Sequence, residues 1–365
     1  MEFFHSHIAP QAIANASKIL ASGRLSEGQQ VREFEAELAA RMGLLHPVAV
    51  NSGTSALHLG LVLSGVGSGD EVILPAQTFV ATGAAILMQR AIPVFSDIDS
   101  QTGNISATSI SEKVTARTKA VIPVHWGGYP CDLDEIAAVA AAHDLSVIED
   151  AAHALGARYQ GRPIGSISRF TAFSFQAIKH LTTGDGGVLC CKQGEDAQAA
   201  RARRWFGIDR ANSAPSALGE RQYDLSVLGF KYHMNDLAAG IGLGNLRDFA
   251  ERLSRRQRIG AYYRDQLADV PGLRLLAHDP DRTHAYWLFT IRVEQRNRFI
   301  RHLAESGIPA SVVHLRIDRN TLFRGQPGTL PGQQEFEAQQ VSIPVHDGLL
   351  DAEVDTVVST IKKGW

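Results

Sequence analysis

The sequence predicts an α/β protein in which a mostly parallel, seven-stranded sheet covered by helices is followed by a smaller α+β domain. The first observation is an alternation of short apolar runs with amphipathic segments between residues 45 and 191, which is typical of parallel sheets flanked by helices. The second is a change to an Arg-, Gly- and Ser-rich texture after residue 195. The third is the length of 365 residues, which is enough for two domains. We place these domains at residues 1–245 and 246–365.

The strands of the sheet are expected where the apolar runs are short and bounded by turn residues. These runs cover residues 47–50, 71–74, 92–95, 120–123, 145–149, 171–175 and 187–191. The helices between them are expected at residues 54–63, 79–89, 106–113 and 133–143. Ligands of such a sheet bind beyond the carboxyl ends of its strands. Asn51, Gln77, Asp150 and the segment after Phe175 all fall at those ends, so they are expected to form one site.

The second half of the chain has a different organisation. Residues 195–232 are expected to form loops and a short helix that reach toward a partner subunit, with residues 205–209 exposed. A helical pattern then runs over residues 235–267 and is stopped by Pro271 and Gly272. The smaller domain continues with strands at residues 273–276, 285–293 and 310–314 and helices at residues 297–306 and 352–362.

Composition excludes several classes of function. The net charge of −2 gives no electrostatic case for nucleic acid or an anionic membrane as partner. No run of about 18 apolar residues and no signal peptide is visible, so we expect a soluble, cytoplasmic protein. Its three cysteines are too few for a disulfide framework and are expected to be buried thiols. Two arginine clusters are either solvated helix faces or a rim that receives a diphosphate. They comprise Arg201, Arg203 and Arg204, and Arg252, Arg255, Arg256 and Arg258.

Lys179 is the residue with the clearest chemical meaning. It lies between two apolar runs, residues 170–175 and 187–191, and burial lowers the pKa of an amine and makes it a nucleophile toward carbonyls. Asp150 ends another buried strand and needs a partner there. The protonated pyridine nitrogen of pyridoxal phosphate (PLP) is such a partner, although a helix cap or a buried salt bridge would also account for Asp150. Together the two residues predict the catalytic pair of a PLP enzyme.

Other residues fit the same cofactor. Gly53 and Thr54 join a strand to a helix, where free amides attract a phosphate, although simple helix capping gives the same pattern. Phe79 follows a strand and can stack on a pyridine ring, or it opens a helix as a core residue. Ser174 can add a hydroxyl to the phosphate site. His153 either contacts the ring or is a structural histidine.

Competing chemistries have little support in the sequence. The histidines are scattered without metal-ligand spacing, so no metal site is expected, and His180 is assigned to packing. Neither a nucleophile elbow of hydrolases nor a Walker-type phosphate loop occurs.

Taken together, these motifs resemble the DegT/DnrJ/EryC1/StrS family of PLP-dependent sugar aminotransferases. The resemblance covers nearly the whole chain, in the Lys179 segment and in residues 22–28, 51–57, 69–73, 93–98, 149–153 and 342–346. It implies PLP fold type I, similar to aspartate aminotransferase. It also implies that PLP is bound by Gly53, Thr54, Phe79, Asp150, His153, Ser174 and Lys179. In the family a residue of the neighbouring subunit completes the phosphate site; here it matches Lys231, so a homodimer with a shared active site is expected.

The departures from the family pattern concern the sugar pocket. Gln176 and Ala177 stand where Tyr-Pro is frequent, Asp185 replaces a commoner Glu, and Trp126 follows His125 where a smaller residue is usual. Relatives with histidine at the lysine position dehydrate their substrate, and Lys179 places this chain outside that group.

The resemblance implies transfer of an amino group from L-glutamate, which becomes 2-oxoglutarate, to a keto-sugar, expected to be nucleotide-linked. The product would serve amino-sugar and surface-polysaccharide biosynthesis. Trp205, His314 and Arg316 are the expected sugar contacts. The alternatives are a PLP-dependent sugar dehydratase or related enzyme of the same fold, and a non-enzymatic regulatory or scaffold protein that retains the fold.

Overall fold

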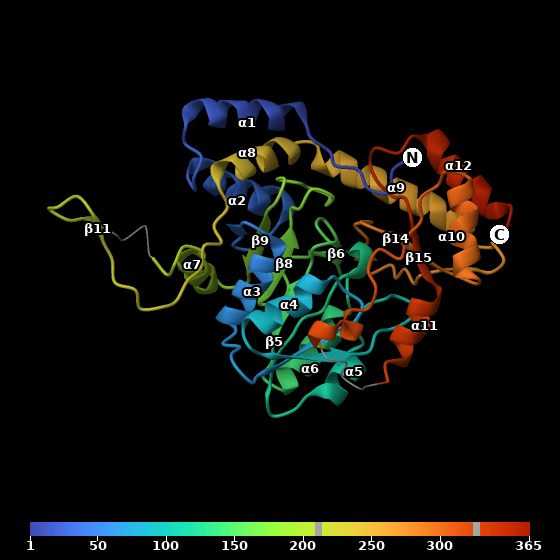
Figure 1. Cartoon of the computed structure of the whole chain (residues 1–365), viewed down its shortest axis with the longest axis horizontal. Helices are drawn as coiled ribbons and strands as arrows, with labels where there is room; N and C mark the ends of the chain where they lie inside the picture. The colour runs from blue at the N-terminus through green and yellow to red at the C-terminus, as the bar shows by residue number, and fades with distance from the viewer. Residues whose placement is uncertain (209–213, 324–328) are drawn as a thin grey trace.

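The computed structural model describes residues 1–208, 214–323 and 329–365 (Figure 1). Its centre is a seven-stranded sheet with the strand order β1-β9-β8-β5-β4-β2-β3. The strands are β1 (Val48–Val50), β2 (Glu71–Pro75), β3 (Ile92–Ser96), β4 (Thr118–Val121), β5 (Ser146–Asp150), β8 (Phe170–Ser174) and β9 (Gly187–Cys191). Only β9 runs antiparallel to its neighbours; the pairings from β3 to β8 are parallel. The predicted mostly parallel seven-stranded sheet is confirmed.

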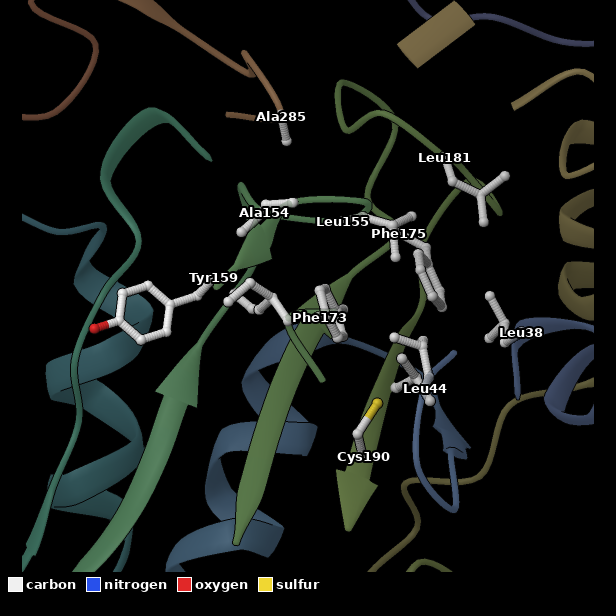
Figure 2. Close-up of a cluster of buried hydrophobic side chains, with 14 of the residues drawn as sticks. Leu38, Leu44, Ala154, Leu155, Tyr159, Phe173, Phe175, Leu181, Cys190 and Ala285 are labelled. Carbon is white, nitrogen blue, oxygen red and sulfur yellow. The ribbon is translucent and has the colours of Figure 1, made fainter. Parts of the chain in front are cut away.

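Helices cover both faces of this sheet. Because side chains of a strand alternate between faces, Cys190 belongs to one hydrophobic core and Cys191 to the other, as adjacent buried free thiols should. The first core contains residues of α2 (Gln29–Met42), α5 (Ala107–Lys113), α6 (Leu133–Ala142) and α8 (Asp236–Asn245). Figure 2 shows part of it, including Phe173 and Phe175 of the β8 region and Leu38 of α2. The second core contains residues of α3 (Gly53–Leu63), α4 (Val80–Met88) and α7 (Gly194–Arg203).

A second, antiparallel sheet builds its own core toward the C-terminal end. It has the order β12-β14-β15. Its strands are β12 (Leu273–Leu275), β14 (Phe289–Val293) and β15 (Gln340–Ile343). Buried residues of α9 (Phe249–Leu267), α10 (Arg296–Glu305) and α12 (Asp351–Lys362) pack with this sheet, among them Tyr263, Phe299 and Val357. This part of the chain has the α+β character expected from the sequence.

The remaining elements connect or flank these two sheets. α1 (Pro10–Ser22) packs on α8 at the outside of the molecule, and α11 (Pro331–Gln339) precedes β15 (Figure 1). A small sheet joins β6 (Arg158–Tyr159), β7 (Arg162–Pro163) and β13 (Arg282–Thr283). The hairpin of β10 (Ala214–Pro215) and β11 (Arg221–Gln222) extends away from the body of the molecule (Figure 1). The described residues also form the short 3-10 helices η1 (Trp126–Gly128), η2 (Ile317–Arg319) and η3 (Thr321–Phe323).

Several boundaries differ from the expected ones. The helix expected over residues 235–267 is two helices, because Asn245 at the end of α8 is buried and its side chain bonds to the main chain of Ala9 and Thr182. The strand expected over residues 285–293 begins only at Phe289, since the residues before it bond to Gly127 and Gly128 instead. Residues 310–314 contribute a single bridge rather than a strand. The helices α1, α2 and α11 and the strand β15 were not predicted.

The arginine clusters are not simply solvated faces. Arg204 is buried and bonds to Glu27 at 2.7 Å and to Glu35 at 2.5 Å. Arg256 is buried and bonds to Asp347 at 3.0 Å. For these two residues the expectation of a solvated face is wrong, because a buried guanidinium must be paired with a carboxylate. Neither residue lines the candidate site described below.

The exposure expected for residues 205–209 has a mixed outcome. Of the segment 205–209, Phe206 is exposed and Trp205 is partly exposed, whereas Asp209 lies outside the described residues. Within the described residues, no helix has the length and apolar character needed to span a membrane.

Candidate active site

A cavity of about 370 Å³ lies beyond the carboxyl ends of the central strands. Eight of the predicted site residues line it: Gly53, Thr54, Phe79, Asp150, His153, Ser174, Lys179 and His314. They come from segments far apart in the sequence, which the sheet brings to one edge. A larger, more open hollow of about 1050 Å³ near α1, α2 and α8 contains none of the predicted residues.

Lys179 lies in a loop whose main chain is held from several sides. The hydroxyl of Ser6 donates to the main-chain carbonyl of Ala177 at 2.8 Å. The guanidinium of Arg252 donates to the main-chain carbonyl of His180 at 2.9 Å. The indole N–H of Trp287 donates to the carbonyl of Ile178 at 3.0 Å. Burial lowers the pKa of Lys179 to about 7, although the charge of Asp150 opposes this effect. A substantial fraction of the amine is therefore an uncharged nucleophile at neutral pH.

Asp150 presents a buried carboxylate to the same cavity. Its oxygens accept hydrogen bonds from the Thr82 hydroxyl at 2.7 Å and the Ala152 amide at 3.2 Å, and Thr78 bonds to Thr82 at 2.7 Å. Burial raises the pKa of Asp150, while the Thr82 hydrogen bond and the charge of Lys179 lower it. Asp150 is in no ion pair with another described residue, so the salt-bridge alternative has no support there. The site can accept a cationic ring nitrogen as the missing partner.

The buried pair of His125 and Glu149 stabilises the end of the strand that carries Asp150. The Nδ1 atom of His125 accepts the amide of Cys131 at 3.0 Å, so its Nε2–H donates to Glu149 at 2.8 Å. Glu149 also accepts from the Ser168 amide and the Thr171 hydroxyl, each at 3.1 Å. The main-chain amide of His125 donates to the carbonyl of Asp150 at 3.2 Å. This pair therefore helps to orient the carboxylate that faces the cavity.

The turn from β1 to α3 fits a phosphate group. Ser52 caps the helix, since its hydroxyl accepts the Ser55 amide at 3.1 Å, so capping does not depend on Gly53 or Thr54. A Cβ atom on Gly53 would lie 3.0 Å from the Cβ atom of Ser174, so glycine permits the close approach of the two strand ends. The helix N-terminus and the Ser174 hydroxyl can together bind an anion.

Aromatic rings line the rest of the cavity. His153 stacks on Trp287 with ring centroids 3.7 Å apart, and His314 lies 5.2 Å from Phe79. Within the described part of the chain, the buried atoms His153 Nδ1 and His314 Nε2 have no hydrogen-bond partner. Burial lowers the pKa of both histidines, that of His314 to about 4, so both are neutral at pH 7. Such orphaned nitrogens indicate a polar ligand in the cavity.

Among the predicted residues, Lys231, Trp205 and Arg316 do not line this cavity, and neither do Asn51 and Gln77 at the strand ends. The ammonium of Lys231 lies 4.3 Å from the centroid of the Trp205 ring, and the two residues form an isolated bridge. Arg316 is buried and bonds to Asp318 at 2.7 Å. Sequence reasoning in turn missed Thr82 and Trp287. Thr82 has a weak signal in its helical spacing from Thr78, whereas Trp287 has no motif that distinguishes it from a core residue.

Comparisons with known proteins identify the family. The sequence profile of the DegT/DnrJ/EryC1/StrS aminotransferase family matches residues 6–362. The chain belongs to this family. It is 39% identical to the spore coat polysaccharide biosynthesis protein SpsC of Bacillus subtilis (strain 168), over 97% of this chain and 94% of the relative. It is 35% identical to the GDP-perosamine synthase of Caulobacter vibrioides, over 92% of this chain and 90% of the relative.

A solved structure agrees with this assignment. The sugar aminotransferase CalS13 from Micromonospora echinospora is 35% identical and superposes with a TM-score of 0.95 over the full length of both chains. The fold is therefore PLP fold type I, as predicted. The protein is a PLP-dependent sugar aminotransferase, since family members use this cofactor. The partly uncharged amine of Lys179, the buried carboxylate of Asp150 and the N-terminus of α3 beside Ser174 fit PLP.

Buried histidines should make the protein acid-labile. Burial lowers the pKa of several histidines. The largest decreases are those of His58 and His314, to about 4, of His180, to about 3, and of His153 and His284, well below the ordinary value. Below about pH 6.5 the unfolded chain binds protons that the folded chain does not. The free energy of unfolding therefore decreases as the pH is lowered. We expect each such histidine to remove up to about 2 kcal/mol at pH 5 relative to pH 7.

Denaturant unfolding at pH 7, 6 and 5 measures this effect. His58→Gln, which lies outside the cavity, should show a smaller loss than wild type. A free energy of unfolding that stays constant from pH 7 to pH 5 would contradict the prediction.

Proposed function

We propose that this enzyme transfers the amino group of L-glutamate to a nucleotide-linked keto-sugar and releases 2-oxoglutarate. The observation that carries the proposal is the arrangement of Lys179 and Asp150 in one cavity, where a partly uncharged amine lies near a carboxylate that forms no ion pair with another described residue. PLP supplies an electron sink for the substrate carbon when it is bound there. Lys179 would bond covalently to the cofactor, and Asp150 would face its pyridine nitrogen.

The other lining residues would bind and orient the cofactor. Gly53, Thr54 and Ser174 would hold the phosphate at the N-terminus of α3. Phe79 and His153 would flank the ring. Lys179, once displaced by the donor amine, would carry a proton between the substrate carbon and the cofactor. Because its pKa lies near 7, this amine can both accept and release a proton at neutral pH.

We further propose that the working form is a homodimer with a shared active site. Lys231 does not line the cavity of its own chain, and it follows a hairpin that extends away from the body (Figure 1). The region around this hairpin carries strongly exposed apolar side chains, Leu218 at 90% and Leu228 at 79%. A second copy would cover these side chains and receive Lys231 at its phosphate site.

The small domain, proposed at residues 246–365, would form part of the substrate site. His314 comes from this part of the chain and offers an unpartnered nitrogen to the sugar. Trp205 lies beside Lys231 and would contribute from the second copy, whereas Arg316 bonds within its own chain. One relative is named for a GDP-linked product, which supports a nucleotide-linked substrate. The buried free cysteines fit a reducing compartment, and we place the enzyme in the cytoplasm.

A half-reaction tests the proposed chemistry. L-Glutamate added to the PLP-loaded protein should abolish the visible absorbance of the bound cofactor and yield one equivalent of 2-oxoglutarate per site. The aminated protein should then return to its starting spectrum with a nucleotide-linked 3-keto or 4-keto sugar, and the rates should follow ping-pong kinetics. Release of water without amino transfer would favour the dehydratase alternative. If borohydride reduction yields no stable cofactor adduct at Lys179, the result would favour the alternative of a non-enzymatic scaffold protein.

A further inference from the structure

The ammonium of Lys179 lies against an aromatic face. Its Nζ atom is 3.6 Å from the centroid of the Trp287 ring. At this distance the negative face of an indole attracts a cation, and the attraction grows when water is excluded. Trp287 is 1% exposed and lines the same cavity as Lys179. The contact therefore joins the proposed reacting atom to a side chain that has no chemical role in the function described so far.

The indole of Trp287 is held in place from several directions. Its N–H donates to the carbonyl of Ile178, the residue before Lys179, at 3.0 Å. The ring of Phe4 stacks on it at 5.1 Å with an interplanar angle of 23°, and that of His153 at 3.7 Å with an angle of 13°. Its main-chain amide donates to Gly127 at 2.8 Å. The indole is thus a fixed surface, tied directly to the loop that carries the lysine.

Lys179 has one competing attraction in the cavity. Asp150 faces it with a buried carboxylate, yet the two groups form no ion pair within 4.0 Å. An ammonium on a flexible four-carbon chain would otherwise move to that carboxylate and occupy the position proposed for the pyridine nitrogen. Of the described residues, the other titratable ones that line the cavity are Asp185, His153 and His314, and His180 follows Lys179 directly. Burial keeps the three histidines neutral at pH 7.

We propose that Trp287 is a positioning residue whose ring holds the ε-ammonium of Lys179 whenever that amine is not bonded to the cofactor. The proposal rests on the proposed covalent role of Lys179. The amine must leave the cofactor and return to it in every half-reaction. A fixed aromatic face stabilises the charged form in a buried place and keeps it away from Asp150.

Competitive trace acetylation tests this proposal in the full-length, cofactor-free protein. The extent of labelling of the Lys179 peptide, measured by mass spectrometry between pH 5 and pH 10, gives the apparent pKa of this one amine, with the exposed Lys192 as internal reference. In Trp287→Leu we expect the pKa to fall by about one unit from about 7, so that Lys179 reacts about fivefold faster at pH 6. Trp287→Phe keeps a weaker aromatic face and should show a smaller decrease in the same direction.

Trp365→Phe is the matched control. The indole N–H of Trp365 also donates to a main-chain carbonyl, that of Glu294 at 2.9 Å, but Trp365 does not line the cavity. This variant should leave the pKa of Lys179 unchanged. The proposal is overturned if Trp287→Leu leaves the pKa in place, or if Trp365→Phe changes it equally. If the leucine variant does not fold, an unchanged pKa in Trp287→Phe overturns it.

The labelling separates this inference from the proposed function. A borohydride-stable adduct at Lys179 together with an unchanged pKa in the Trp287 variants rejects the positioning role and leaves the covalent role intact. Absence of the adduct in wild type rejects the covalent role itself.

Discussion

Lys179→Ala is expected to lower kcat by at least about 10⁴-fold, because one side chain supplies both the covalent attachment and the proton transfer. The pure variant should also lack the borohydride-stable cofactor adduct. Lys179→Arg is the sharper second variant, since it keeps a cation at this position but provides no nucleophile. It should be as inactive as the alanine variant if the nucleophile, and not the charge, is what matters.

Lys192→Ala is the control for these variants. Lys192 follows β9 directly and is exposed, so its loss should leave both kcat and the adduct unchanged. Steady-state rates with a keto-sugar and glutamate, together with the mass of the reduced protein, measure both properties. Turnover of Lys179→Ala within tenfold of wild type would remove the central assumption of the proposed mechanism.

Asp150→Asn is expected to lower kcat by about 10³-fold while the protein remains folded. Asparagine has nearly the same shape and can still accept the Thr82 hydroxyl, but it carries no charge to face a protonated pyridine nitrogen. Thr82→Val removes the hydrogen bond to the carboxylate, together with the bond between Thr78 and Thr82, and should lower kcat by about tenfold. A larger decrease of kcat in Asp150→Asn than in Thr82→Val would show that the charge of Asp150 contributes more to catalysis than its orientation by Thr82.

Asp144→Asn is the control for Asp150→Asn, because it removes one negative charge close to the same strand, β5. Asp144 is exposed in the turn before the strand and has a φ of 53°, a conformation that asparagine tolerates well. Its rate should equal that of wild type. Equal rates for Asp150→Asn and wild type would contradict the proposed role of Asp150.

The sequence predicted the central sheet well because alternation and burial are local properties. The runs that became β2, β3, β5 and β9 each carry their own apolar signal, and strand ends place Asp150 and Ser174 without further information. The same argument located most of the cavity, because polar residues at strand ends must meet at one edge of the sheet.

The residues that sequence reasoning missed depend on tertiary contacts. Trp287 lies 108 residues after Lys179 in the chain, and only folding brings its ring to the amine. Arg204 looked like a surface charge because its partners, Glu27 and Glu35, are far away in the sequence. Helix α2 was overlooked because its apolar stripe of Val31, Phe34 and Leu38 is flanked by many charged residues.

The extreme N-terminal segment has a practical consequence for anyone who handles this enzyme. Ser6 bonds to the loop of Lys179, and Phe4 stacks on the ring that contacts the lysine amine. A purification tag fused ahead of Met1 would thus be attached close to the reaction centre. Extensions after Trp365 begin at a partly exposed residue that does not line the cavity, and they are the safer choice for immobilising or labelling the catalyst.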